Sequence, residues 1–512
     1  MSAFVTDQFR ILNAGSFVES ISNNSYYAFL GLSNPTAAGF GRTSDWNSST
    51  TNNPVDNFQH LSHYRDTSLF GKKITTENAR RVIRKVEWIS NNQYDMYRHD
   101  YGQYENRNNP APITKALKLY DANYYVITSD FKIYVCIENG TSGLNPTVPR
   151  STFEPTHTDV EPVSYADGYK WKYLFKVSPS DVIKFDSTEF IVVPNNWATT
   201  TDSDIEIIRD GGNSDNNNNQ IKTVYIENGG AGYSNGTASI LGDGTGGEVS
   251  ITTTSGVITE IAVTAGGKGY TYGIVDLSTN SGSGSKLIPI IPPSKGHGYD
   301  VYTELGTDKV LLYARFDDST KDFPIDTKFA QVGIIKNPEK FVGSGQTFTD
   351  NTFSSLFAVG LSSTRTVNIG EQITQNQGNN VTAKGYVASF DSETKILKYY
   401  QDRSLCFGNE FDQTQSPDTT GITTFKAFDS TQFNNSANII FSDGTAAGID
   451  TGLNGSVITV NSKQINLGVT FSNGLANPEI NKKTGDIIYI DNRPEVQRDS
   501  RQKEDVKIIL EF

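Results

Sequence analysis

The sequence predicts a mainly β protein that is rich in loops. Hydrophobic residues make up only 36% of the 512 residues, yet aromatic residues reach 11%, and the chain holds 45 glycines. Short runs of β-branched and aromatic residues recur between stretches rich in Gly, Asn and Ser, which is typical of strands joined by turns. A chain of this length is expected to contain two to four structural units.

The first elements that the sequence predicts are a strand and a helix. Residues 26–33, YYAFLGLS, form a short apolar run, which predicts a strand. From Thr75 to Val86, apolar residues recur at helical spacing and basic residues take the opposite face, which predicts a helix. Thr75 or Thr76 is suited to cap its start.

A hairpin and a further strand follow. Residues 124–138, YYVITSDFKIYVCIE, contain two β-branched runs around a turn near Ser129-Asp130, which predicts a hairpin. Residues 189–194, EFIVVP, predict a strand that ends at Pro194, because proline has no N–H to continue a ladder.

Residues 165–179, YADGYKWKYLFKVSP, pose a choice between a binding surface and a packed strand. Interleaved aromatic and basic residues can mark a nucleic-acid surface. Strict alternation instead puts the aromatic side chains on one face and the lysines on the other. We therefore predict a packed strand that starts after the Asp167-Gly168 turn, with Trp171 in the core and Lys172 facing solvent or a partner.

An internal repeat follows a linker predicted at residues 210–219, DGGNSDNNNN. VYIENGGAGYSNG, from Val224, matches IAVTAGGKGYTYG, from Ile261, at an offset of 37 residues. Each copy predicts a strand, a Gly-rich turn that ends in Tyr, and another strand. The glycines supply positive φ, and each tyrosine can pack back over its turn where a glycine leaves room.

The remaining stretches are also β-like. Residues 341–480 are rich in Gly, Ser, Thr and Asn and contain strand-like pieces such as TKILKYY and NIIFSDG. Residues 481–512 end in VKIILEF, where alternation predicts a final strand tied into a sheet.

Few residues in the sequence suggest a catalytic, metal-binding or phosphate-binding site. His60 and His63 have the spacing of a metal pair but lack neighbouring ligands. His157-Thr158-Asp159 with Glu161 hints at acid–base work, but a solvated loop explains it better. Residues 242–249, GDGTGGEV, lack the Lys-Ser/Thr of a phosphate loop and the carboxylates of a calcium loop. We therefore expect no catalytic, cofactor-binding or metal-binding residues and no enzymatic activity.

Charge and cysteine content narrow the partners. The net charge of −13, from 44 basic and 57 acidic residues, argues against general nucleic-acid binding. Cys136 and Cys406 are the only cysteines, so a disulfide framework is not expected and a reducing compartment is indicated. The N-terminus lacks the apolar segment of a signal peptide, and no stretch is long enough to predict a membrane span.

Five stretches share a further resemblance. They are FGRTSDWNS (40–48), DGYKWKYLFKV (167–177), EFIVVP (189–194), FAQVGIIKNP (329–338) and GDIIYIDNRPEVQRDSRQKEDVKIILEF (485–512). Together, and in this order along the chain, they resemble the baseplate wedge protein called gene product eight of T4-like contractile-tailed phages, in an enlarged form of the kind expected in a cyanophage.

The resemblance implies a layered β-sandwich core with short helices in loops. The core would comprise residues 1–198, 296–340 and 481–512, interrupted by an inserted Gly/Tyr-repeat β module (199–295) and a second inserted β module (341–480). It implies a non-enzymatic role in the virion, linking peripheral and inner baseplate proteins after assembly in the host cytoplasm. The implied partners are a second copy, as a homodimer, and wedge proteins resembling gene products six, seven and ten.

Two other functions stay open at this point. A receptor- or glycan-binding tail protein could stack Tyr233, Tyr270 and Tyr272 on sugars. A tail-associated hydrolase is a further alternative, although no residue pattern indicates its catalytic groups.

Overall fold

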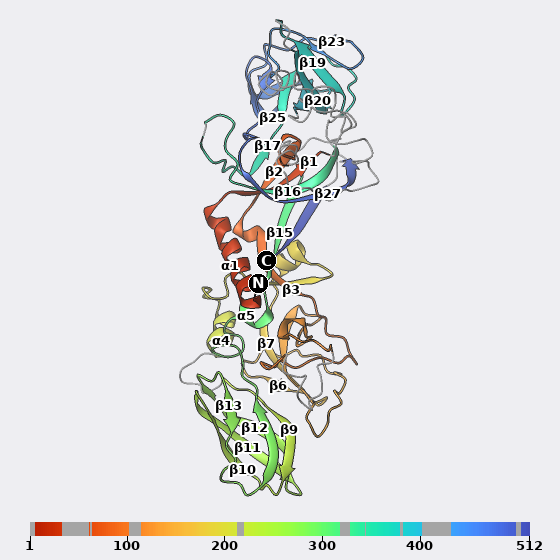
Figure 1. The fold of residues 1–512 in the computed structure, drawn as a ribbon. Helices are drawn as coiled ribbons and strands as arrows, with labels where there is room; N and C mark the ends of the chain where they lie inside the picture. The colour runs from red at the N-terminus through yellow and green to blue at the C-terminus, as the bar shows by residue number, and fades with distance from the viewer. Residues whose placement is uncertain are drawn as a thin grey trace, which may run out of the picture. The chain divides into compact units, whose positions relative to one another are not determined.

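The computed structural model describes residues 6–32, 61, 64–101, 114–211, 220–317, 328–343, 345–378, 382–401, 432–497 and 503–512. The fold is mainly β, built from several antiparallel sheets with short helices, as the sequence predicts (Figure 1). The chain divides into two compact units. Unit 1 contains residues 1–18, 80–311 and 509–512, and unit 2 contains residues 19–79 and 312–508.

The main sheet of unit 2 has the strand order β17-β2-β1-β16-β27. Its strands are β1 (Tyr26–Gly31), β2 (Ser68–Ile74), β16 (Lys328–Lys336), β17 (Thr352–Ser354) and β27 (Asp486–Gln497). The predicted strand at residues 26–33 is confirmed as β1, which lies between β2 and β16 and is buried along its whole length. Tyr27 and Phe29 pack there with Ile335, Phe348 and Phe353.

Two further sheets have four strands each, and one of them contains the stretch at residues 165–179 as strand β7. One has the order β4-β5-β7-β6, and the other has the order β28-β15-β3-β8. The predicted hairpin is confirmed as β4 and β5, whose turn places Phe131 at a φ of 60°. The predicted strands at residues 167–177 and 189–194 are confirmed as β7 and β8, and the final strand is confirmed as β28. The bounds are β3 (Ala79–Arg84), β4 (Tyr125–Ile127), β5 (Lys132–Asn139), β6 (Val163–Ser164), β7 (Tyr169–Lys176), β8 (Phe190–Val193), β15 (Lys309–Phe316) and β28 (Glu504–Glu511).

The helix predicted from Thr75 to Val86 is wrong. A short 3-10 turn, η1 (Thr76–Asn78), leads into strand β3, which pairs with β8 so that Val82 lies opposite Val192. Val82 and Ile83, adjacent in sequence, are both buried. The β-branched pair is held by sheet partners remote in sequence, and this contact overrides the local helical spacing.

The longest helix, α1, was not predicted. It runs from Asp7 to Asn23, and within unit 1 it buries Ile11, Ala14 and Val18. The other helices are short, as expected for helices in loops. They are η3 (Leu119–Asp121), α3 (Pro179–Phe185), α4 (Ser203–Gly211) and α5 (Val301–Leu305).

The Gly/Tyr repeat folds into six strands that pair only with one another (Figure 1). A four-stranded sheet, β12-β11-β10-β13, lies with the two-stranded sheet β14-β9 around one apolar cluster. Of the linker predicted at residues 210–219, the first two residues end helix α4 and the rest lie outside the described residues. The strands are β9 (Val224–Ala231), β10 (Gly236–Gly242), β11 (Thr245–Thr254), β12 (Val257–Lys268), β13 (Gly273–Val275) and β14 (Ser283–Pro289).

The described residues of the interval 341–480 contain a seven-stranded sheet and a two-stranded hairpin. Strand β17 also lies in this interval, yet it pairs with β2 in the main sheet of unit 2. Val359, Ile373 and Leu397 lie in the apolar cluster of the seven-stranded sheet. The strands are β18 (Phe357–Gly360), β19 (Gln372–Asn376), β20 (Thr382–Asp391), β21 (Ile396–Tyr400), β22 (Ile439–Ile440), β23 (Ala446–Ala447), β24 (Gly455–Val460), β25 (Lys463–Phe471) and β26 (Leu475–Ala476).

Candidate functional site

Strand β7 is part of a core rather than a binding surface. Its aromatic face is buried, as predicted: Trp171 stacks on Tyr169 at 5.6 Å between ring centroids, and Tyr94 meets the Trp171 ring edge-on at 5.7 Å. Bases could not stack on these rings, because Tyr169 and Trp171 have no exposed surface.

The prediction that Lys172 faces solvent or a partner is wrong. Lys172 is only 1% exposed, because residues near Val160 cover the second face of β7, and its Nζ donates a hydrogen bond to the Val160 carbonyl at 2.5 Å. Burial lowers the pKa of Lys172 to about 8, and the nearby Lys222 charge adds to the shift. A buried lysine with one hydrogen bond and no carboxylate bonded to it is costly to keep charged.

The histidine candidates do not converge on a site. His157 lies 3.6 Å from Asp159, and burial lowers the pKa of its imidazole. Glu161 instead pairs with Lys222 at 2.7 Å. His60 and His63 lie outside the described residues. Among the residues that the structure does describe, no group of three or more His, Cys, Asp or Glu side chains is placed to hold a metal ion.

The two Gly-Tyr turns fold as predicted and match each other closely. Gly230 and Gly267 both have a φ of 62°. The Tyr233 ring lies over Gly282, where a Cβ would come within 2.3 Å of it, and the Tyr270 ring lies over Gly244, where a Cβ would come within 2.4 Å. Each of these glycines lies one residue before the strand that pairs with the turn's first strand, Gly282 before β14 and Gly244 before β11, so the structural repeat is longer than the sequence match indicates.

This packing changes which tyrosines could bind a sugar. Tyr233 and Tyr270 are 7% and 2% exposed, so their rings are part of the module's core. The Tyr270 hydroxyl donates to the Ile240 carbonyl at 2.8 Å and accepts from the Gly247 N–H at 3.0 Å. Of the three tyrosines, Tyr272 alone is exposed, at 62%.

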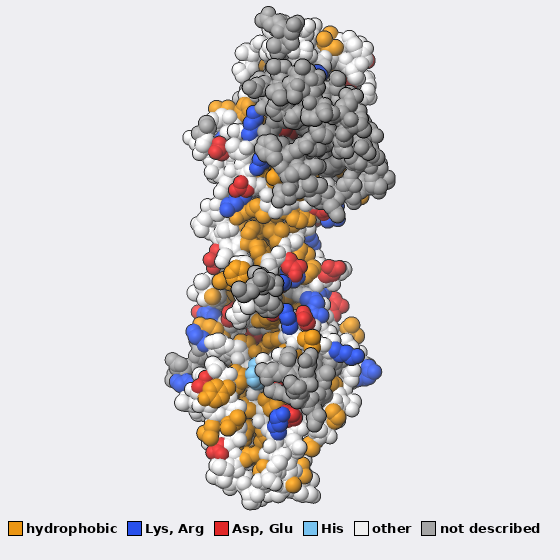
Figure 2. All heavy atoms as spheres, in the orientation of Figure 1, with side chains coloured by type: hydrophobic (Ala, Val, Ile, Leu, Met, Phe, Trp, Pro, Cys, Tyr) orange, Lys and Arg blue, Asp and Glu red, His pale blue; other side chains and the backbone are white. Residues whose placement is uncertain are grey.

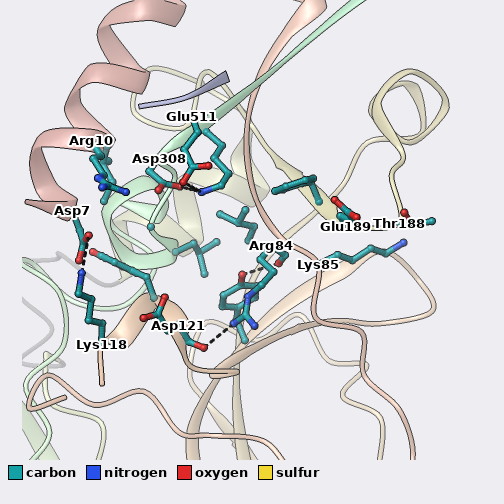
Figure 3. Close-up of a pocket in the computed structure, with 18 residues that line it drawn as sticks. Asp7, Arg10, Arg84, Lys85, Lys118, Asp121, Thr188, Glu189, Asp308 and Glu511 are labelled. Atoms are coloured by element: carbon teal, nitrogen blue, oxygen red, sulfur yellow. Dashed lines mark hydrogen bonds and ion pairs between the residues drawn. The ribbon is translucent and has the colours of Figure 1, made fainter. Parts of the chain in front are cut away.

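Sequence reasoning missed a cavity in unit 1 (Figure 3). It has a volume of about 660 Å³ and is lined by the start of α1, strands β3 and β4, the segments at 118–121 and 188–190, the end of α5 and strand β28. Its apolar walls include Ile11, Ile83 and Leu305, all buried. Gly306 has a φ of 70° and lacks a Cβ that would lie 2.4 Å from the Tyr120 ring, so only glycine lets that ring form part of the wall.

Charged side chains of both signs surround the cavity (Figure 3). Lys118 lies 3.9 Å from Asp7, and Lys309 lies 2.9 Å from Asp308 and 3.2 Å from Glu511. Burial opposes the charge on Lys309, but its bonds to the two carboxylates outweigh burial and raise its pKa. The basic residues are Arg10, Arg84, Lys85, Lys118 and Lys309, and the acidic residues are Asp7, Asp121, Glu189, Asp308 and Glu511.

Four of these charges have no ion-pair partner among the described residues. The side chains of Arg10, Asp121 and Glu189 make no ion pair, and Arg84 donates to the Asp121 and Ala122 carbonyls, at 3.2 and 3.1 Å. Burial raises the pKa of Tyr120 to about 12, with nearby carboxylates adding to it, so this wall stays neutral at physiological pH. The cavity can therefore hold a ligand through charge pairing and apolar contact.

No sequence pattern could have predicted this cavity, because its residues come from segments that are far apart along the chain. Its arginines do not fall in a motif of fixed spacing. On the face drawn in Figure 2, the described basic and acidic side chains are interspersed rather than gathered into one large field of a single sign.

Comparison with known proteins does not assign a family. No protein-family model matches the chain, and no curated protein matches it. Within the part of the chain that the structure describes, none of the helices has the length and apolar character needed to cross a membrane.

Proposed function

We propose that the protein is a structural component of a phage tail baseplate wedge. In this role it links peripheral baseplate proteins to the inner ring and assembles as a homodimer. Its other partners are wedge proteins resembling gene products six, seven and ten. It is assembled in the host cytoplasm and becomes part of the virion.

The position of the family-like stretches in the fold carries the proposal. FAQVGIIKNP lies on β16, which pairs along its length with β27 of the C-terminal stretch. EFIVVP lies on β8, in the same sheet as β28 of the C-terminal stretch. Two pairs of stretches that are remote in sequence thus share a sheet, as expected if they belong together in one ancestral core. FGRTSDWNS lies outside the described residues.

Exposed apolar side chains give the proposal a second support. Phe9 and Leu12, one turn apart on α1, are 53% and 65% exposed, and Ile183 on α3 is 78% exposed. Large apolar side chains left on the surface are typical of proteins that bury them against a neighbour. Strong, specific contact with neighbours is what a wedge protein must provide.

Electron microscopy of purified phage tails labelled with antibodies against this chain tests the proposal. We expect label confined to the baseplate. Label at fibre tips would favour receptor binding. Absence of label, when antibodies against the denatured chain detect it in the same particles, would mean only that the epitopes are buried. Absence from the particles altogether would overturn the proposal.

For the receptor- or glycan-binding alternative, only one of the three tyrosines is still available to stack on a sugar. Because Tyr233 and Tyr270 are core residues, a stacking site would depend on Tyr272. A glycan array probed with the full chain and with a Tyr272→Ala variant would detect such a site. Binding lost in the variant would support the alternative, and an array with no signal would remove it.

A further inference from the structure

We propose that the cavity of unit 1 binds a short segment of a partner polypeptide that carries one acidic and one basic side chain around an apolar residue. The cavity is the one shown in Figure 3. This inference goes beyond the proposed function, because it does not depend on the particle to which the protein belongs.

The balance of charges selects the class of ligand. Five basic and five acidic side chains line the cavity, so their formal charges cancel. A phosphate or nucleotide would be attracted to the arginines but repelled by the acidic side chains around them, and a polycation would meet the reverse. A ligand that carries both signs can pair its carboxylate with Arg10 or Arg84 and its cation with Asp121 or Glu189.

The charged side chains without an ion-pair partner and the apolar walls of the cavity contribute to affinity in different ways. Arg10 and Glu189 have no ion-pair partner among the described residues, so a ligand gains their charge-assisted hydrogen bonds without breaking an existing pair. The hydroxyls of Tyr120 and Tyr125 are already used, donating to the Thr303 and Arg84 carbonyls at 2.7 Å each. The rings therefore serve as apolar walls, and the charges provide the specificity.

The size of the cavity favours a peptide segment over a single small zwitterion. A volume of about 660 Å³ lies well inside the range of roughly 300 to 1,000 Å³ that holds drug-sized ligands. A free amino acid would contact one part of this wall and leave the rest hydrated. Several consecutive residues can reach the charges at separate parts of the rim together with the apolar walls formed by Ile11, Ile83 and Leu305.

The test measures binding of capped tetrapeptides to the full-length chain by saturation-transfer NMR. One peptide has glutamate, leucine, phenylalanine and lysine in order. Two others carry glutamate at both ends or lysine at both ends, and free leucine stands for a small zwitterion. We expect the mixed-charge peptide to bind at least about tenfold more tightly than either single-sign peptide. A single-sign peptide can pair with only the basic or only the acidic side chains of the cavity.

Variants of the free charges locate the binding. Arg10→Ala and Glu189→Gln are each expected to weaken binding of the mixed-charge peptide by about tenfold. Lys463→Ala, which removes an exposed charge from unit 2, is the control and should leave binding unchanged. The proposal is overturned if no peptide binds saturably at millimolar concentration, if leucine or a single-sign peptide binds as tightly, or if Arg10→Ala binds as wild type does.

Discussion

Strand β7 and strand β11 both alternate in sequence, but only β11 alternates in burial. On β11 the buried residues Gly247, Val249 and Ile251 are separated by side chains that are wholly or partly exposed. On β7, the five residues from Trp171 to Phe175 are all buried, including the lysine between the aromatic rings. Alternation with a period of two residues therefore predicts a strand. It does not predict whether both faces of that strand are buried, because the segments that cover the second face come from elsewhere in the chain.

The two regions also fill their cores differently. Around β7, large rings pack against one another, as Trp171 does with Tyr94 and Tyr169. In the Gly/Tyr module, two tyrosines occupy space that glycines leave open. The first core should be most sensitive to the loss of a large side chain, and the second to the gain of a small one.

Trp171→Ala should have the largest effect. Removing a fully buried indole from β7 is expected to lower the free energy of unfolding by about 3 to 5 kcal/mol. Denaturant unfolding followed by circular dichroism measures it. Lys176→Ala, on the exposed end of the same strand, is the matched control and should change stability little. Equal effects of the two changes would contradict the packing of β7.

Lys172→Met should remove a pH dependence that the wild type has. The pKa of Lys172 falls from 10.5 to about 8 in the folded state, so the cost of burying its charge is fully present below pH 8. As pH rises from 8 to 10.5, the folded state loses this proton before the unfolded state does. The wild-type free energy of unfolding should therefore rise by about 3 kcal/mol relative to the variant.

The measurement is a series of denaturant unfolding curves of both proteins between pH 7 and 10. Subtracting the variant from the wild type removes the contribution of the buried tyrosines, which titrate in both. A difference that stays constant with pH would contradict the burial of a charged Lys172.

Gly244→Ala should destabilise the Gly/Tyr module by about 1 to 3 kcal/mol, because the new methyl group would press against the Tyr270 ring. Thermal unfolding of the full chain, with hydrogen exchange of peptides from β11 and β12, would detect the change locally. Gly236→Ala is the control, since nothing lies within 4 Å of the added Cβ. If both variants unfold alike, the packing of Tyr270 does not depend on the absence of a side chain at Gly244.

Glu248→Gln should have the smallest effect. This side chain lies on the exposed face of β11, so removing its charge is expected to change the free energy of unfolding by less than about 0.5 kcal/mol. The same unfolding curves measure it. A loss comparable to that of Trp171→Ala would mean that the outer face of β11 is covered as β7 is.

Local patterns predicted several strands correctly but failed where remote contacts decide the structure. The strand at residues 26–33, the hairpin at 124–138 and both Gly-Tyr turns follow from short-range residue preferences, and all are confirmed. The stretch from Thr75 to Val86 has helical spacing, yet pairing with β8 makes it a strand. No residue near Lys172 in sequence indicates that its side chain would be covered.

Helix α1 could have been found. Ile11, Ala14, Val18 and Ile21 recur three or four residues apart, which is the helical period, and all four are buried. The cavity could not have been found, because its charges come from segments as far apart as Asp7 and Glu511, and only the folded chain brings them together. Sequence patterns describe single elements well and sites built from several elements poorly.

A cryo-EM reconstruction of the baseplate from the source phage would test the proposed function most directly. The two units would be fitted separately into the map. We predict that the five-stranded sheet around β1 and the sheet containing β7 both match density in the wedge, at two copies related by a twofold axis. Density for these sheets at a fibre tip, or at no position in a well-resolved baseplate, would contradict the proposal.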